Sequence, residues 1–148
     1  MKIVIGADHA GYELKEKVKK YLQKKGIEVE DVGTFSKDSV DYPDYAFKVA
    51  EKVSDKKVDF GVLVCKSGIG MSIAANKFKN VRAALVFNPE MAKLARSHND
   101  ANVLSLSQEF TKEDEAYKIL ETWMETKFEG GRHERRVGKI TKIEKENK

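Results

Sequence analysis

The sequence predicts an α/β fold: a single three-layer α/β/α domain built on a five-stranded parallel sheet, with a protruding C-terminal helix. Five short runs rich in β-branched residues alternate with amphipathic stretches of helical period. The run at residues 60–64 is apolar throughout, as expected of a parallel strand covered on both faces. At 148 residues the chain has the length of one domain with its own hydrophobic core.

The first half of the chain predicts two strands and two helices in alternation. The strands are expected at residues 3–5 and 27–32, and Gly26 ends the helix between them. Pro43 stands where the second helix begins, because proline is favoured in the first helical turn. The inner faces of the two helices are expected to carry Leu14, Val18, Tyr21, Leu22, Ala46, Phe47, Ala50 and Val53.

The second half continues this alternation. Strands are expected at residues 60–64, 83–87 and 103–106. A short helix follows the first of these strands, and Asn88-Pro89 caps the helix after the second. The segment from Thr111 to Asp114 resembles a capping box, with Asp in place of the usual Glu, and opens a helix that carries Trp123. Five consecutive βα units predict a parallel, Rossmann-like sheet with helices on both faces.

The clearest break in the pattern is Gly130-Gly131. We therefore expect an α/β domain over residues 1–129 and a basic helical tail of the same domain over residues 130–148. In the tail, Val137, Ile140 and Ile143 recur every third residue in a charged background, which predicts a helix with a narrow apolar stripe. The glycines let this helix leave the body, so we expect it to contact a partner subunit.

The net charge of +4 resides in the tail. Residues 132–148 hold seven Lys or Arg and three Asp or Glu, so the rest of the chain is neutral overall. This distribution predicts an anion site or a docking tail and argues against a nucleic-acid interface. The sequence shows no apolar run of membrane-spanning length, no signal peptide and only one cysteine. We therefore expect a cytoplasmic protein that does not bind membranes.

Segments rich in glycine and polar residues punctuate the pattern. Ligands of open α/β sheets bind at the carboxyl ends of the strands. Residues 6–11 follow the first strand and residues 65–72 follow the third, while His98-Asn99 follows the fourth helix. We expect His9 and His98 both to lie on the ligand side, where Asp8 and Asn99 could fix their tautomers.

Cys65, the single cysteine, has two interpretations. A lone cysteine at a strand end is usually a small buried hydrophobic residue. Gly68 and Gly70, however, let the backbone approach a ligand and expose its N–H groups, and the next helix begins there. The positive N-terminal end of that helix would favour a thiolate at Cys65, and a thiolate suits nucleophilic attack or proton abstraction next to a carbonyl.

Three phosphate-binding patterns fail at these loops. No Lys follows the glycines as a P-loop requires, Met71 stands where a cysteine phosphatase needs Arg, and Gly6 and Gly11 lack the dinucleotide pattern. Asp8, His9, Cys65 and His98 could all ligate a metal, but their spacing carries no metal signature, so we expect none. Arg132 and Arg136 are one helical turn apart and could clamp a phosphate, although, taken alone, a solvated basic turn is the better explanation.

Taken together, these segments resemble the ribose-5-phosphate isomerase B family, which includes galactose- and allose-phosphate isomerases. The resemblance runs from Ile3 to about Ile143. It rests on six segments in order: Gly6-Ala7-Asp8-His9-Ala10-Gly11, Asp41-Tyr42-Pro43, Cys65-Lys66-Ser67-Gly68-Ile69-Gly70, Ser72-Ile73-Ala74-Ala75-Asn76-Lys77, His98-Asn99-Asp100-Ala101-Asn102 and Glu129-Gly130-Gly131-Arg132-His133.

The resemblance implies interconversion of ribose 5-phosphate and ribulose 5-phosphate through an enediolate, without metal or cofactor. Cys65 matches the family's base, and His98 matches the residue that assists ring opening. Ser67 and the amides through Gly70 match the loop that stabilises the enediolate. Family members are homodimers or homotetramers with sites shared between subunits. The matching substrate-binding positions are Asp8, His9, Tyr42, Lys66, Gly68, Ile69, Gly70 and Asn99, with Arg132 and Arg136 as phosphate ligands.

Two positions depart from the family pattern. Lys66 stands where Gly is common, and Gln108-Glu109 stands where a phosphate-side Arg is often found. We hypothesise that Lys66 replaces the missing charge. Two other functions remain open: a six-carbon (allose or galactose 6-phosphate) isomerase, and a sugar-phosphate binding protein without catalysis.

Overall fold

The computed structural model describes residues 1–147 and confirms the predicted α/β fold. All five strands are parallel, in the order β2-β1-β3-β5-β4. The strands are β1 (Lys2–Ala7), β2 (Glu28–Asp31), β3 (Phe60–Cys65), β4 (Ala83–Leu85) and β5 (Val103–Ser107). The helices are α1 (Tyr12–Lys24), α2 (Tyr42–Ser54), α3 (Ile69–Ala75), α4 (Pro89–Ser97), α5 (Glu113–Glu125) and α6 (Arg132–Glu146).

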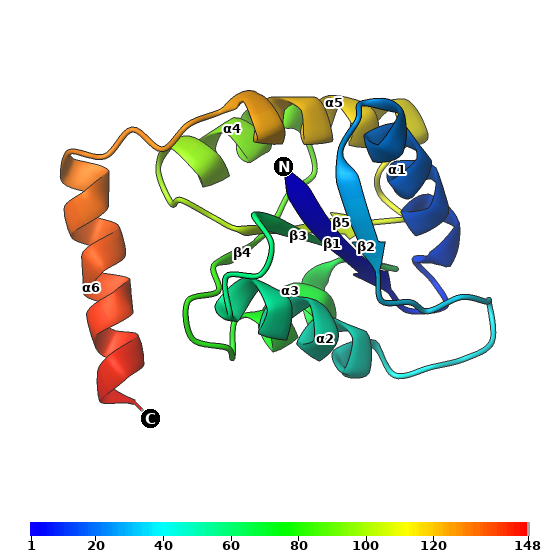
Figure 1. The fold of residues 1–148 in the computed structure, drawn as a ribbon, viewed down its shortest axis with the longest axis horizontal. Helices are drawn as coiled ribbons and strands as arrows, with labels where there is room; N and C mark the ends of the chain where they lie inside the picture. The colour runs from blue at the N-terminus through cyan, green and yellow to red at the C-terminus, as the bar shows by residue number, and fades with distance from the viewer. Residues whose placement is uncertain (148) are drawn as a thin grey trace.

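The helices form a layer on each face of the sheet. Helices α1, α4 and α5 cover one face, and α2 and α3 cover the other (Figure 1). Successive strand residues point to opposite faces, so Val62 and Val64 join the core under α1, α4 and α5. Leu63 and Cys65 join the core under α2 and α3. This alternation places the Cys65 side chain on the α2–α3 side.

Two predicted details are wrong. Helix α5 begins after Lys112 without a side-chain hydrogen bond at its start, and the hydroxyl of Thr111 is buried with no partner. The expected capping box therefore does not form. Phe47 was expected on the inner face of α2 but is 41% exposed, because Val49 and Ala50 fill that face. By contrast, the Asn88 cap is confirmed, since its Oδ1 accepts a hydrogen bond of 2.8 Å from the Met91 N–H.

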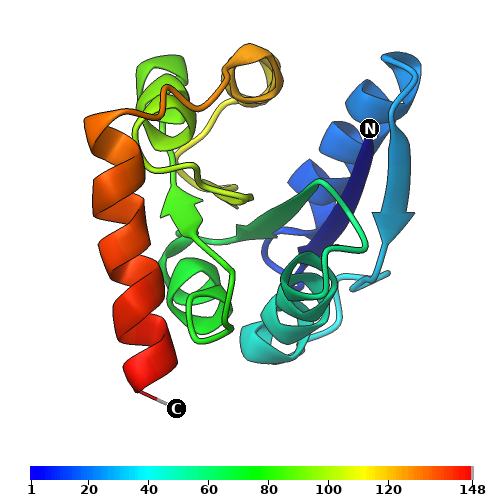
Figure 2. The same cartoon turned by 60° about the vertical axis from the view of Figure 1, so that its left-hand side comes forward.

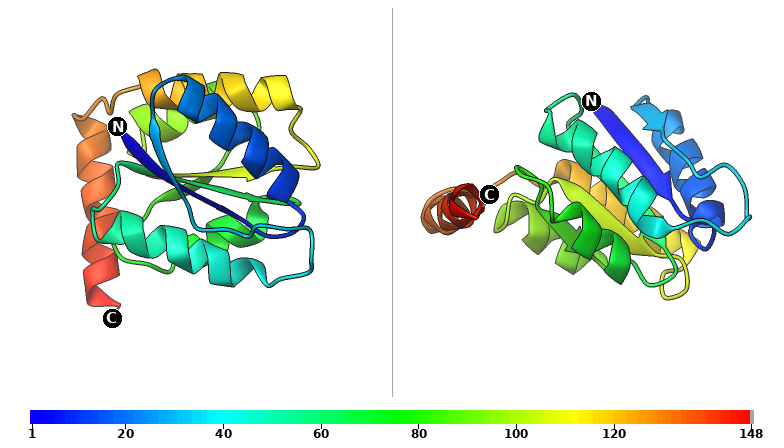
Figure 3. Two further views of the ribbon diagram at one scale, coloured as in Figure 1. Left: turned by 45° about the vertical axis from the view of Figure 1, so that its right-hand side comes forward. Right: turned by 90° about the horizontal axis from the view of Figure 1, so that it is seen from below.

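Helix α6 stands apart from both layers. Figures 2 and 3 show it beside the β4 edge of the sheet, joined to α5 by an extended segment. His133 is the buried residue of this helix, while Ile140 and Ile143 are 52% and 56% exposed. Near its other end, Glu144 accepts a hydrogen bond from the Asn80 N–H at 2.9 Å. Within residues 1–147, no helix combines the length and apolar character needed to cross a membrane.

Candidate active site

A pocket of about 420 Å³ opens at the carboxyl end of β3. We call it the thiol pocket, because Cys65 stands in its wall. The structure brings together here seven residues that the sequence predicted for the site. The lining residues are Asp8, Tyr42, Cys65, Lys66, Ser67, Ile69, Gly70 and Ile73.

The loop after β3 folds around the sulfur atom. The Gly68 N–H donates a hydrogen bond to Cys65 Sγ at 3.1 Å, and Gly68 has a φ of +79°, which residues with a side chain rarely adopt. The Ile69 N–H donates to Ser67 Oγ at 3.2 Å. A Cβ added to Gly70 would lie 2.5 Å from the Tyr42 ring. Glycine at this position therefore lets the loop pack directly against the tyrosine.

The first helix also reaches this loop through a glycine. A Cβ on Gly11 would lie 2.3 Å from the carbonyl oxygen of Val64, so only glycine fits between α1 and the end of β3. The Gly11 N–H donates to Asp8 Oδ1 at 3.0 Å, which holds the Asp8 carboxylate beside the pocket. Two segments far apart in the sequence thus meet at Cys65.

The protonation of Cys65 follows from this setting. The residue is 5% exposed, and burial raises the pKa of its thiol. The N–H groups of Met71 and Gly68 act in the opposite direction, while the negative charge of Asp8 raises the pKa further. In the single chain the thiol is therefore predominantly protonated at neutral pH.

The two positions that depart from the family pattern lie next to each other. Lys66 Nζ is 4.0 Å from Glu109 Oε2, and the Glu109 N–H donates to the Lys66 carbonyl at 3.2 Å. Both side chains are exposed, at 71% and 48%, so the pair is screened by solvent and weak. Glu109 thus offsets part of the charge that Lys66 brings to the rim of the thiol pocket.

His9 follows β1, as expected, but does not line the thiol pocket. Its Nδ1 accepts a hydrogen bond of 3.1 Å from the Val40 N–H. This bond assigns the remaining proton of a neutral ring to Nε2. His9 therefore connects the end of β1 with the segment that leads into α2.

The expectation that His98 shares the ligand side with Cys65 is wrong for a single chain. His98 ends α4, and a helix in a βα unit returns the chain to the amino ends of the strands. Val103 pairs with Gly61, whereas Cys65 lies four residues further along β3. The His98-Asn99 loop, which precedes Val103, is thus about 13 Å or more from Cys65 along the strand direction. Arg132 and Arg136 on α6 also lie outside the thiol pocket.

An arginine clamp holds the loop that carries His98 and Asn99. Arg82 Nε donates to the carbonyls of Asn99 and Asp100 at 3.2 and 3.0 Å. The Asp100 carboxylate accepts from Arg82 at 3.3 Å and from Arg96 at 3.1 Å. Asp100 has a φ of +47°, a strained conformation that the two arginines stabilise. No motif in the sequence points to Arg82 or Arg96.

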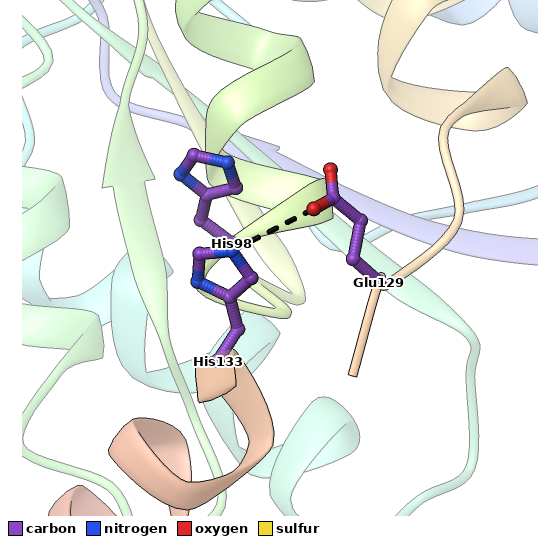
Figure 4. Close-up of side chains that lie close together, drawn as sticks. All are labelled: His98, Glu129 and His133. Carbon is purple, nitrogen blue, oxygen red and sulfur yellow. Dashed lines mark ion pairs between the residues drawn. The ribbon is translucent and has the colours of Figure 1, made fainter. Parts of the chain in front are cut away.

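A second cluster joins His98 to Glu129 and His133 (Figure 4). Their potential ligand atoms all lie within 4.8 Å of one another, and this is the one such group of His, Cys, Asp or Glu among residues 1–147. The two imidazole rings are stacked, however, with planes only 12° apart. Ring lone pairs lie in the ring planes, so those of stacked rings run side by side and do not converge on one ion. The cluster is therefore a stack of two rings. His133 and Glu129 are functional candidates that their spacing in the sequence does not indicate.

The fold and the thiol pocket define a class of single-domain α/β proteins with a cysteine at the carboxyl end of a central parallel strand. A family model described as Ribose/Galactose Isomerase matches residues 3–140, and the chain belongs to this family of isomerases.

Relatives of known name agree with this assignment. The chain is 45% identical over 143 residues to ribose-5-phosphate isomerase B of Escherichia coli, covering 97% of this chain and 96% of that protein. The solved ribose-5-phosphate isomerase B of Clostridium thermocellum superposes with a TM-score of 0.99 at 49% identity, over 100% of both chains. That of Mycoplasma genitalium, solved with bound ribulose-5-phosphate, gives a TM-score of 0.95 at 44% identity, over 99% of this chain and 97% of that one.

Replacing Asp8 by Asn should lower the pKa of the Cys65 thiol. The substitution removes the negative charge that disfavours the thiolate, while Asn Oδ1 can still accept the Gly11 hydrogen bond. Thiolate absorbance or alkylation rate as a function of pH would measure the shift. Asp38→Asn, on an exposed loop, serves as the control. An unchanged or higher thiol pKa in Asp8→Asn would contradict this account of the pocket's electrostatics.

Removing the Asp100 carboxylate should destabilise the protein. For Asp100→Ala we expect the free energy of unfolding to fall by about 2 kcal/mol, a value between those for exposed and buried ion pairs. The reason is that two arginines lose a partner and Ala disfavours the positive φ. Asp100→Asn keeps a residue that tolerates this φ and should lose about half as much. Urea unfolding would give both values, and equal stability of wild type and Asp100→Ala would rule out the clamp as a stabilising contact.

Proposed function

We propose that this isomerase interconverts ribose 5-phosphate and ribulose 5-phosphate in the cytoplasm, without metal or cofactor. The observation that carries the proposal is the thiol of Cys65, held by the Gly68 N–H in the wall of a pocket large enough for a sugar phosphate. The relative solved with bound ribulose-5-phosphate supports the choice of substrate.

In the proposed mechanism, the Cys65 thiolate transfers a proton between two carbons. It removes the proton from C2 of the open-chain aldose, and the electron pair moves to form the C1–C2 double bond of an enediolate. The Cys65 thiol then delivers a proton to C1, the C2 hydroxyl loses its proton as C2 becomes the ketone, and the C1 oxygen gains a proton to become a hydroxyl. Ser67 and the N–H groups through Gly70 hold the two oxygens on which charge develops.

Ring opening precedes this transfer. The C1–O4 bond of the furanose breaks, O4 gains a proton, and the C1 hydroxyl loses one. We assign assistance in this step to His98, with Asn99 beside it. Asp8, His9, Tyr42, Lys66 and Ile69 bind the sugar, and Arg132 and Arg136 bind the phosphate.

We further propose that each site is completed by a second copy of the chain. Cys65 lies at the carboxyl edge of the sheet, whereas His98 lies at the amino edge and Arg132 on α6, so one chain cannot present all three to one sugar phosphate. The rim of the thiol pocket carries Ile69 and Ile73, which are 50% and 57% exposed. Exposed apolar side chains of this kind are typical of an interface.

Helix α6 supports the same assembly. Its residues Ile140 and Ile143 are exposed on a helix that stands away from its own domain. We propose that the tail over residues 130–148, of which Lys148 lies outside the described residues, docks on the partner and brings Arg132 and Arg136 toward the partner's thiol pocket. A homodimer satisfies this geometry, and a homotetramer could be built from two such dimers.

A six-carbon substrate is the second candidate, because the matching family description names galactose as well as ribose. The volume of the completed site would discriminate the two. A protein that binds sugar phosphates without turnover is the third candidate, and the presence of both Cys65 and His98 argues against it.

Cys65→Ala should abolish isomerisation, because it removes the base. We expect a loss of at least about a hundredfold, the usual contribution of a positioned general base. Ribose 5-phosphate, allose 6-phosphate and galactose 6-phosphate would each be assayed with and without a chelator, and Cys65→Ser provides the matched control of similar size. Full activity of Cys65→Ala would refute the mechanism, and inhibition by the chelator would refute the metal-free reaction.

Mixing two inactive variants should restore activity if sites are shared. In a dimer of one Cys65→Ala chain and one His98→Ala chain, one of the two sites carries neither substitution. Random pairing of equal amounts should therefore recover about a quarter of wild-type activity. The measurement is turnover after co-refolding, compared with each variant refolded alone. No recovery, with mixed dimers verified by mass, would place both residues in a site formed by one chain.

A further inference from the structure

The stacked pair of His98 and His133 joins two segments of the proposed site. The ring centroids are 4.1 Å apart and the planes differ by 12° (Figure 4). His98 ends α4 and His133 lies in the first turn of α6. The Glu129 N–H donates to the Ser97 carbonyl at 3.0 Å and so fastens the connecting segment to the end of α4. The stack is therefore built on an anchored backbone.

His133 is the more enclosed of the two rings. It is 5% exposed, and its Nε2 is buried without a hydrogen-bond partner. Glu129 Oε1 lies 3.6 Å from that nitrogen, too far for a hydrogen bond. Burial lowers the pKa of His133, and the neighbouring His98 and Arg132 lower it further. The His133 ring is thus neutral at pH 7 and can stack on His98 without charge repulsion.

The position of His133 in the sequence links two proposed roles. Arg132 precedes it and Arg136 follows within one turn of α6. A change in the stack would therefore move the end of the helix that carries the phosphate ligands, and a change in α6 would move the ring that faces His98. His133 is the buried residue of α6, and its stack on His98 is a contact of the first turn of α6 with the body.

We propose that His133 is a positioning residue for ring opening: it holds the imidazole of His98 by stacking, so that His98 is oriented toward the furanose oxygen of the sugar phosphate. This inference rests on the proposed function. His133 touches neither of the reacting carbons in this assignment, so its removal should impair ring opening and leave the proton transfer at Cys65 intact.

Two reactions separate these steps. Turnover of ribose 5-phosphate begins from a closed furanose and requires ring opening. Ribulose 5-phosphate cannot close to a furanose, because the C5 oxygen that would attack C2 carries the phosphate. In heavy water, exchange of the C1 proton of ribulose 5-phosphate for deuterium therefore reports the enediolate step at Cys65 without any ring chemistry.

We expect His133→Ala to lower turnover of ribose 5-phosphate about tenfold, because a misplaced His98 would lose part of the rate that a positioned acid–base group contributes. The rate of C1 exchange should stay within about twofold of wild type. His133→Phe keeps a flat ring and should stay within about threefold of wild type in both reactions. Nuclear magnetic resonance would follow the exchange, and a coupled assay would follow turnover.

Other outcomes would overturn the proposal. Equal losses of turnover and exchange in His133→Ala would indicate general disruption, and no loss in either would show that the stack is dispensable. A His133→Phe variant as impaired as His133→Ala would assign the effect to a ring nitrogen. His98→Ala is the reference for failure of the proposed function itself: if it spares turnover of ribose 5-phosphate while wild type is active, the role assigned to His98 is wrong.

Discussion

The common direction of the five strands governs where chemistry can occur in this protein. In a parallel sheet each helix carries the chain back, so residues after strands and residues after helices lie at opposite edges. Cys65 ends β3, while His98 follows α4 and Arg132 follows α5. The register of β3 with β5 sets the separation between Cys65 and the His98 loop at about four residues of strand, a distance that no side-chain movement closes.

Most of the fold was predictable because it depends on local pattern. The apolar run at residues 60–64 and the Asn88-Pro89 cap both form as the sequence indicates. Details that depend on tertiary packing were not predictable. The Thr111 hydroxyl is buried without a partner at the end of the loop before α5, and Phe47 is displaced outward by the smaller Val49 and Ala50. A capping pattern specifies which residue types stand at a helix start. It does not determine whether the backbone places its N–H groups within hydrogen-bond distance of those side chains.

In the candidate site, too, residues placed by local pattern were predictable, and residues placed by tertiary contacts were not. Asp8 and Ser67 follow strands and Cys65 ends one, and the structure brings all three into one pocket. The place of His98 follows from the order of elements in the sequence, because a residue at the end of a helix in a βα unit lies at the amino edge of the sheet. Arg82 and His133 had no such signal, because their roles come from the contacts they make with Asp100 and with His98.

The protonation of Cys65 gives a chemical reason for the proposed site between two chains. Burial of the thiol raises its pKa, so a single chain holds a poor base at neutral pH. Lys66 brings a positive charge to the pocket, but its side chain is exposed and paired with Glu109. It therefore does little to lower the pKa of the Cys65 thiol. Arg132 and Arg136, once placed opposite the thiol pocket of a partner, would add positive charge where the enediolate and the phosphate both need it. In the proposed assembly, the stack that holds the start of α6 and the thiol at the end of β3 would act on one substrate from two chains, and the added positive charge would lower the pKa of the Cys65 thiol.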